Sequence, residues 1–422
     1  MESRTAHLRY VDGLRAIAVL GVIFYHGVCE ALWATPWFSA PMQANPAWWF
    51  VTLSSKGAHG VDLFFVISGF CLAYPTLARL RQGQRTSFDL RGFLAKRIAR
   101  IVPPYYAAIA LLLGIVMLAT HAGLPRLGAV GHDLSPLSIL RQALFLDRGA
   151  DFVNGSFWTL GIELRWYLAF PFLLLLYVRS ARTFFALLAA CVLAYNFTQL
   201  RAIDIGTLPG FMLGIVAADW RIVAHRFSRF ALPAMLVAFD LALALEPYAS
   251  MPSRFGLADD TGYFVQTNIG WQLASFCFVV ASGQVAWLRR LLELPVLCAI
   301  GVSAYGIYLV HQPIISAWGE HAGLHLDPVP NFAGSVLLAL AGGLLFSHLA
   351  ELPFLQARVR GLIVNRLGRP IAWLFSLAGL PSRLDLGEAQ VPAAEHSAPV
   401  DAQRERHLAI GRAVGPVRLG LE

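Results

Sequence analysis

Charged residues are scarce in this chain. Asp, Glu, Lys and Arg make up 14% of its 422 residues, whereas 57% are hydrophobic. A soluble protein of this length needs more charge to cover its surface. Repeated apolar runs of about 20 residues are typical of helices that cross a lipid bilayer. The composition therefore argues against a soluble enzyme and predicts an all-α polytopic membrane protein.

Cysteine motifs and basic clusters are missing as well. The five cysteines are scattered, mostly within apolar runs, and show neither a CxxC pair nor the spacing of a zinc or disulfide site. The net charge of +8 comes from basic residues in alternate loops, without a basic stripe interleaved with aromatic residues. We therefore expect no bound metal and no nucleic-acid partner.

Ten apolar segments predict about ten transmembrane helices. They are residues 11–28, 58–78, 101–120, 157–178, 183–200, 205–221, 230–246, 265–287, 296–318 and 332–355. With this assignment, the loops on one side carry 20 Lys and Arg residues and those on the other side carry six. The positive-inside rule then places both termini in the cytoplasm.

The end of the last span divides the chain into three predicted parts. Residues 1–358 form a membrane domain, 359–380 a segment on the cytoplasmic membrane surface, and 381–422 a tail rich in Pro, Ala and charge. A tail of this composition buries too little apolar surface to fold, so we expect disorder there. In the loop 121–156, apolar residues at helical spacing fit either an interfacial or re-entrant helix or a half-buried loop.

The first apolar segment contains two residues that are costly in lipid, Arg15 and His26. They are eleven positions apart, so an α-helix places them on nearly the same face, about 16 Å apart along its axis. Charged groups inside a span normally face protein or water. This stripe therefore marks a candidate functional path.

Two further arginines, Arg97 and Arg100, lie in KRIARIVPPYY at the predicted cytoplasmic mouth of the third span. A guanidinium binds a phosphate through two parallel hydrogen bonds, so arginines at that mouth suit a phosphate-bearing ligand. The alternative is that both are ordinary positive-inside anchors of the helix.

Asp62, Glu163 and His311 are predicted to lie with His26 in the outer half of the membrane. A histidine near a carboxylate in a low-dielectric site suits general-base work on a hydroxyl. Structural roles are the alternatives. His311 could hydrogen-bond between helices, and the two carboxylates could form salt bridges, for example with Arg165.

Five segments in this order resemble the acyltransferase family 3 membrane proteins, which O-acylate polysaccharides and other envelope or secreted molecules. They contain Arg15 with His26, the run GVDLFFVISGF, Arg97 with Arg100, Trp158 with Glu163, and His311 in SAYGIYLVHQPI. Together they span about residues 10–355. Where the family often has Glu-Glu or Glu-Gln, this chain has Glu163-Leu164-Arg165.

The resemblance implies an acyl-CoA donor, usually acetyl-CoA, on the cytoplasmic side of a bacterial inner membrane. Arg97 and Arg100 would hold the CoA phosphates, and Arg15 would orient the donor inside the bundle. The acceptor would be a hydroxyl of an envelope or exported glycan or glycolipid. Some family members carry a fused hydrolase-like domain, which we do not expect here.

The same resemblance implies that His26 deprotonates the acceptor hydroxyl or relays the acyl group. Glu163 or Asp62 would orient the imidazole ring, with His311 beside it. Direct transfer and an acyl-enzyme route both stay open at this point.

Two other classes of protein fit parts of the pattern. A polytopic transporter would explain the Gly/Pro-interrupted segments and intramembrane charges, but it predicts repeat symmetry between the halves of the chain, which is not visible. A scaffolding membrane protein would leave the Arg15–His26 stripe without a purpose.

Overall fold

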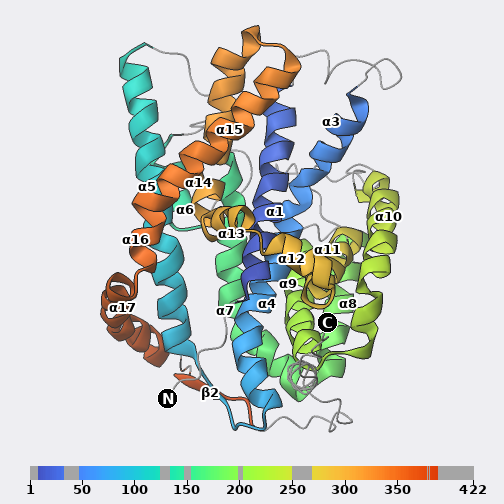
Figure 1. Ribbon diagram of the computed structural model, residues 1–422. Helices are drawn as coiled ribbons and strands as arrows, with labels where there is room; N and C mark the ends of the chain where they lie inside the picture. The colour runs from blue at the N-terminus through green and yellow to red at the C-terminus, as the bar shows by residue number, and fades with distance from the viewer. Residues whose placement is uncertain are drawn as a thin grey trace, which may run out of the picture.

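The computed structural model of the chain describes residues 8–32, 47–123, 134–146, 154–197, 203–249, 269–377, 379 and 381–387. These residues are mostly helical, and the long helices pack into a bundle (Figure 1). The helices are α1 (Arg9–His26), α3 (Trp48–Ser55), α4 (Gly60–Arg81), α5 (Leu90–His121), α6 (Pro136–Ala143), α7 (Trp158–Arg179), α8 (Ala181–Phe197), α9 (Ile203–Ile222), α10 (Ala231–Ala249), α11 (Ile269–Gln284), α12 (Ala286–Leu292), α13 (Pro295–Val302), α14 (Ala304–Ala317), α15 (Pro328–Phe346), α16 (Leu352–Leu355) and α17 (Ala357–Leu377). Two short strands, β1 (Ser87–Asp89) and β2 (Arg383–Asp385), pair with each other.

Six helical stretches of the described residues are long and apolar enough to cross a membrane, or eight if each of two bent helix pairs counts as one span. The bent pairs are α11 with α12, at 99°, and α13 with α14, at 76°. All ten segments predicted from the sequence overlap helices, so the all-α polytopic architecture is confirmed. The count of ten spans and the location of the termini stay predictions.

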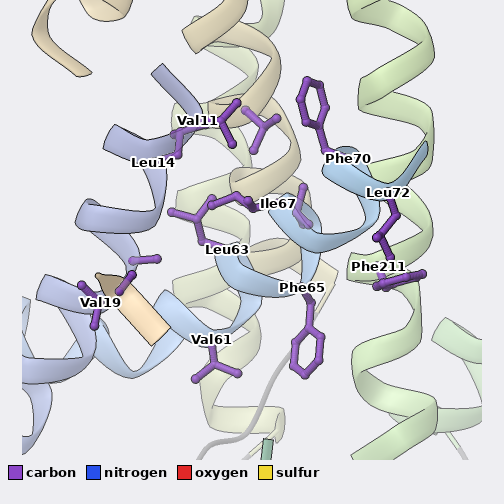
Figure 2. Close-up of a cluster of buried hydrophobic side chains, with 14 of the residues drawn as sticks. Val11, Leu14, Val19, Val61, Leu63, Phe65, Ile67, Phe70, Leu72 and Phe211 are labelled. Atoms are coloured by element: carbon purple, nitrogen blue, oxygen red, sulfur yellow. The ribbon is translucent and has the colours of Figure 1, made fainter. Parts of the chain in front are cut away.

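The centre of the bundle is formed by α1, α4 and α9, which pack through apolar side chains and small residues. Figure 2 shows Val11, Leu14 and Val19 of α1 in the same buried cluster as side chains of α4 and Phe211 of α9. Where α4 crosses α9, a Cβ atom on Gly69 would lie 2.1 Å from the Phe211 carbonyl oxygen. Only glycine lets the two backbones approach this closely.

The first turns of α1 pack against the bent helix pairs. A Cβ atom on Gly13 would lie 2.1 Å from the Leu292 carbonyl oxygen, at the end of α12. A Cβ atom on Gly301 of α13 would lie 1.8 Å from the Asp12 carbonyl oxygen. The junction between α13 and α14 therefore lies beside the end of α1 that carries Arg15.

Three helices widen into π-helical turns at their C-terminal ends. The turns are Gly27–Ala31 after α1, Trp318–Ala322 after α14 and Ser347–Glu351 after α15. A π turn closes its hydrogen bonds over one more residue than an α turn and is frequent at functional sites. Helical structure thus continues from α1 to Ala31, past the predicted end of the first span at residue 28.

The predicted loop 121–156 contains a helix. Ser135 caps α6 by accepting a hydrogen bond of 3.2 Å from the Ser138 N–H, and Pro136 occupies the first turn. The Tyr105 hydroxyl of α5 donates to the Gln142 carbonyl at 2.7 Å. Of the two alternatives left open for this loop, the structure contains the helix.

The chain beyond the last candidate span returns to the bundle. α17 packs along α5, and β2 then pairs antiparallel with β1, with Leu384 opposite Phe88. Phe88 and Leu386 are buried, so apolar contacts stabilise this small sheet. A strand therefore occupies the start of the segment that the sequence predicts to be disordered, whereas residues 388–422 lie outside the described residues.

Candidate active site

A cavity of about 120 Å³ lies inside the bundle. Its walls come from α1, α4, α5, α7, α13, α14 and the π turn after α15. The charged and hydroxyl-bearing residues that line it are Arg15, Ser68, Arg97, Arg100, Thr159, Glu163, Tyr167, Tyr305, Tyr308 and Glu351. The fold therefore brings together four residues that the sequence analysis selected from three distant segments: Arg15, Arg97, Arg100 and Glu163.

Arg15 reaches this cavity from the second turn of α1. Its Nη1 donates to Asp12 Oδ1 at 2.9 Å, and its Nη2 donates to Cys71 Sγ of α4 at 3.3 Å. Asp12 is buried, so this ion pair supplies the partner that an arginine inside an apolar span requires. The pair holds the guanidinium at the cavity wall.

Arg97 and Arg100 lie one turn apart on α5. The Arg97 guanidinium packs over two aromatic rings, with its carbon 5.7 Å from the Phe93 centroid and 5.8 Å from the Tyr167 centroid. Its buried Nε has no hydrogen-bond partner among the described residues. Within that part of the chain, neither arginine forms an ion pair with a carboxylate. Their donors are thus available to an anionic ligand.

Glu163 belongs to the arginine level of the site. It accepts hydrogen bonds from the Tyr167 hydroxyl and, at 3.3 Å, from Ser68 of α4. The sequence predicts it at the level of His26, whereas the structure places it on the wall of the cavity that Arg97 also lines. The hydroxyls of α4 and α7 supply the partners that a carboxylate needs away from water.

Glu351 closes the same cavity from the π turn after α15. It is 1% exposed, and its Oε2 accepts hydrogen bonds from the Gly306 N–H (2.9 Å) and the Ser347 hydroxyl (2.7 Å). Gly306 lies in the first turn of α14, where N–H groups lack helical partners. Oε1 of Glu351 has no hydrogen-bond partner among the described residues. Glu351 therefore caps the broken helix and keeps one oxygen for a further donor.

At the far end of α1, His26 lies beside His311 of α14. Their ring centroids lie 5.0 Å apart, in an edge-to-face arrangement at 64°. His26 Nδ1 lies 2.7 Å from Glu30 Oε1, which also accepts a hydrogen bond of 2.8 Å from Gln312. Because an ionised carboxylate only accepts, Nδ1 carries the hydrogen and Nε2 of the neutral ring keeps its lone pair. This is the arrangement of a general base.

His311 is fully buried, and its tautomer follows from its contacts. Nδ1 lies 2.7 Å from the Tyr308 carbonyl oxygen, so it donates the hydrogen, and Nε2 is an acceptor. Nε2 has no hydrogen-bond partner among the described residues. Buried polar atoms are rarely unpaired, and such exceptions concentrate at functional sites.

The carboxylate that contacts the His26 ring is Glu30, rather than Glu163 or Asp62 as the sequence analysis expected. Asp62 Oδ2 lies 2.9 Å from His59 Nδ1, one turn earlier in the chain. Glu30 follows His26 by four positions within one π turn, so the two side chains meet without any help from another helix. Asp62 therefore contacts a histidine of its own segment, and its role at the site stays a prediction.

Two residues just before α7, Asn154 and Ser156, form hydrogen bonds to α14 close to His311. Pro313 has no N–H, so the carbonyl of Leu309 loses its helical partner. The Asn154 side chain donates to this carbonyl at 2.9 Å. On the adjacent residue, the Tyr308 hydroxyl donates to the Ser156 carbonyl at 3.0 Å. These bonds hold the backbone that carries His311.

Four residues at the site have no role in the sequence analysis: Glu30, Tyr308, Gln312 and Glu351. The predicted end of the first span leaves Glu30 in a loop, although its four-residue spacing from His26 is the signal for a contact. Glu351 carries the signal of a carboxylate within an apolar span. No group of three His, Cys, Asp or Glu side chains in the described parts of the chain is arranged to hold a metal ion.

Comparison with known proteins gives a family and distant relatives. The model of the acyltransferase 3 family, described as an acyltransferase domain, matches residues 8–348. The O-acetyltransferase OatA of Staphylococcus aureus is 24% identical over 337 residues, which are 73% of this chain and 51% of that protein. The putative peptidoglycan O-acetyltransferase YrhL of Bacillus subtilis is 25% identical over 360 residues, 75% of this chain and 50% of that protein.

A third relative, the peptidoglycan O-acetyltransferase OatA of Listeria monocytogenes, is 25% identical over 359 residues, 72% of this chain and 49% of that protein. The chain thus spans about half the length of these relatives. No solved structure matches it.

The family match runs from α1 to the π turn after α15, and so includes the helices that build the arginine-lined cavity and the histidine pair. A base held by a carboxylate and a cavity with available guanidinium groups suit the transfer of an acyl group. All three relatives are named as O-acetyltransferases, which favours an enzyme over a transporter or a scaffold. The chain belongs to the acyltransferase 3 family.

Proposed function

We propose that this enzyme moves an acyl group, most simply acetyl, from acyl-CoA to a hydroxyl of an envelope or exported glycan or glycolipid. One observation carries the proposal: an arginine-lined cavity and a histidine pair, of which His26 is held by Glu30, occupy two levels of the same helices, α1 and α14. Two relatives have peptidoglycan in their names, which supports a glycan hydroxyl as the acceptor.

The arginines would recognise the donor. Arg97 and Arg100 form no ion pair with a carboxylate in the described residues, so the phosphates of CoA would be their anionic partners. Arg15 would orient the donor farther into the bundle. The helix separates Arg15 from His26 by about 16 Å. An extended CoA arm is long enough to keep its phosphates at one level while the thioester reaches the other.

His26 would act as the base. The acceptor hydroxyl gives its proton to His26 Nε2 while its oxygen attacks the thioester carbonyl carbon. The carbon–sulfur bond breaks, and the departing CoA thiolate takes the proton from the imidazolium. Glu30 stabilises that imidazolium through Nδ1–H. His311 Nε2, an acceptor beside His26, would position the hydroxyl.

A second route uses the same atoms. His26 Nε2 first attacks the thioester carbonyl carbon, and the carbon–sulfur bond breaks to release the CoA thiolate. The acceptor hydroxyl then attacks the acyl group on Nε2, which frees the imidazole, and the hydroxyl proton passes to the thiolate. In both routes the acyl donor enters from the arginine level. The loop charges of 20 against six support a cytoplasmic donor site in an inner membrane, with the histidines in the outer half.

The proposal is tested with cells that lack the gene. They are complemented with wild type, His26→Ala or His348→Ala, and acetyl signals of extracted surface polysaccharide and peptidoglycan are measured by proton NMR. Because general-base catalysis contributes on the order of 10²-fold or more, His26→Ala should lose the acetyl signal. His348 is exposed and its Nδ1 contacts only its own helix, at the Leu344 carbonyl, so it is the matched control. A full acetyl signal with His26→Ala would contradict the assignment.

The donor site is tested separately by calorimetry with acetyl-CoA and purified protein. The double variant Arg97→Ala with Arg100→Ala should bind acetyl-CoA on the order of 10- to 100-fold more weakly, because it loses charge-assisted hydrogen bonds. Arg358→Ala with Arg360→Ala removes the same charge from the exposed part of α17 and should leave the affinity unchanged. Equal affinities of the two double variants would refute the role of Arg97 and Arg100.

A further inference from the structure

Tyr308 belongs to both levels of the site. It lines the arginine-containing cavity, and its ring centroid lies 5.3 Å from that of His311. A donor that enters beside the arginines therefore meets Tyr308 before it meets the histidine pair. The side chain stands where the reactive end of the donor has to lie.

The Tyr308 side chain is held firmly in this position. Its hydroxyl donates to the Ser156 carbonyl at 3.0 Å and accepts from the Thr159 hydroxyl at 2.8 Å. The Phe64 ring packs against it edge-to-face, with centroids 6.0 Å apart. A rotation of the side chain would break two buried hydrogen bonds and a ring contact, so Tyr308 forms a rigid wall.

The cavity is small, and its two ends differ in character. Its volume is about 120 Å³. Near the junction of α13 and α14, Glu351 accepts from the Gly306 N–H, and Arg15 pairs with Asp12, whose carbonyl packs against Gly301. Phe64 instead packs on the Tyr308 ring. A donor whose phosphates contact the arginines would direct its acyl end toward the apolar walls at Tyr308. Each added methylene group there has to displace packed side chains.

We propose that Tyr308, with Phe64, narrows the donor cavity beside the histidine pair, where the acyl group has to lie, and so restricts the enzyme to short acyl groups, acetyl in preference to butyryl and longer chains. This inference rests on the proposed acyl-CoA donor site. One misplaced methylene group in an apolar pocket changes discrimination by about 10- to 200-fold, which sets the expected size of the effect. Tyr308 is thus the residue that determines acyl-chain length.

The test measures equilibrium binding of acetyl-CoA, butyryl-CoA and hexanoyl-CoA to purified enzyme by displacement of a fluorescent CoA. Wild type should bind acetyl-CoA at least about tenfold more tightly than hexanoyl-CoA. Tyr308→Ala should reduce this ratio by about tenfold or more, because it opens space beyond the acetyl group. Tyr308→Phe keeps the ring and should keep the ratio, although it loses both hydrogen bonds of the hydroxyl.

Tyr106→Ala is the matched control, since Tyr106 is an exposed tyrosine of α5 that does not line the cavity. If Tyr308→Ala does not purify as folded protein, Phe64→Ala widens the cavity from the facing wall and has to shift the ratio in the same direction. If a folded Tyr308→Ala or Phe64→Ala variant binds acetyl-CoA and keeps the wild-type ratio of acetyl-CoA to hexanoyl-CoA affinity, the inference on chain length is overturned. The proposed donor site would still stand. Failure of wild type to bind any of the three thioesters overturns the proposed donor as well.

Discussion

Glu30 shows how much of the proposed chemistry depends on one side chain. Its carboxylate accepts from both His26 and Gln312, so Glu30→Ala would leave the imidazole without its orienting partner. We expect acetyl transfer to fall on the order of 10²-fold, with the affinity for acetyl-CoA unchanged because the arginine-lined cavity is a separate level of the site. The measurements are the acetyl content of surface glycans and calorimetry with acetyl-CoA.

Glu30→Gln serves as the comparison, because an amide oxygen can still accept the hydrogen of Nδ1 without carrying a charge. It should retain more activity than Glu30→Ala. Wild-type acetylation by Glu30→Ala would show that His26 does not need this carboxylate.

Single residues were predictable where their cost in lipid is high. Arg15 is predictable because a charge inside an apolar segment has to face protein or water, and Arg97 and Arg100 because guanidinium groups at the mouth of a span suit a phosphate. All three line one cavity. The level of Glu163 was not predictable from residue counts, which treat helices as straight and parallel. Its position follows instead from hydroxyl partners on two helices.

At the scale of the helices, the crossing of α4 and α9 depends on Gly69. A Cβ atom there would lie 2.1 Å from the Phe211 carbonyl oxygen, so Gly69→Ala has to push the backbones apart. We expect a loss of about 1–3 kcal/mol or more in the free energy of unfolding, as for other overpacked interiors. The change is measured as a lower midpoint of thermal unfolding in detergent.

Gly114→Ala is the control for this substitution, since nothing lies within 4 Å of the added Cβ atom in the middle of α5. Alanine favours a helix over glycine by about 1 kcal/mol, so this variant should be as stable as wild type or more stable. If the Gly69→Ala and Gly114→Ala variants unfold at the same midpoint temperature, the close crossing of α4 and α9 is contradicted.

Apolar length predicted where helices occur, but it did not predict their bends. The predicted span 296–318 is one segment in the sequence, whereas the structure breaks it into α13 and α14 at 76°. The break lies where Gly301 packs against the backbone of Asp12, nearly 300 residues earlier in the chain. Such a contact leaves no periodicity in the local sequence.

For the whole molecule, the orientation in the membrane is the prediction with the widest consequences. Arg85 and His121 lie near opposite ends of α5, and α5 extends along much of the bundle (Figure 1). We expect an impermeant maleimide to label His121→Cys in intact cells and Arg85→Cys only after permeabilisation, because basic loops stay inside. Both are made in a variant whose five native cysteines are replaced by alanine.

Labelling of Arg85→Cys in intact cells would invert the orientation and place the arginine level on the outer side. Charge counts in the loops predict the orientation because translocation acts on the whole chain. No property that can be counted along the sequence predicts that α1, α5, α7 and α14 line one cavity. Their arrangement arises from packing contacts between distant segments.

In the π turn after α1, the number of residues between His26 and Glu30 determines how the two side chains meet. Deleting Gly27, Val28 or Cys29 would reduce the spacing of His26 and Glu30 from four positions to three and rotate all that follows by about 100°. Glu30 would then no longer meet both His26 and Gln312 as it does now, although no side chain had been substituted. When distant members of the family are aligned at this helix, a gap of one position in this turn therefore changes how the acid holds the base.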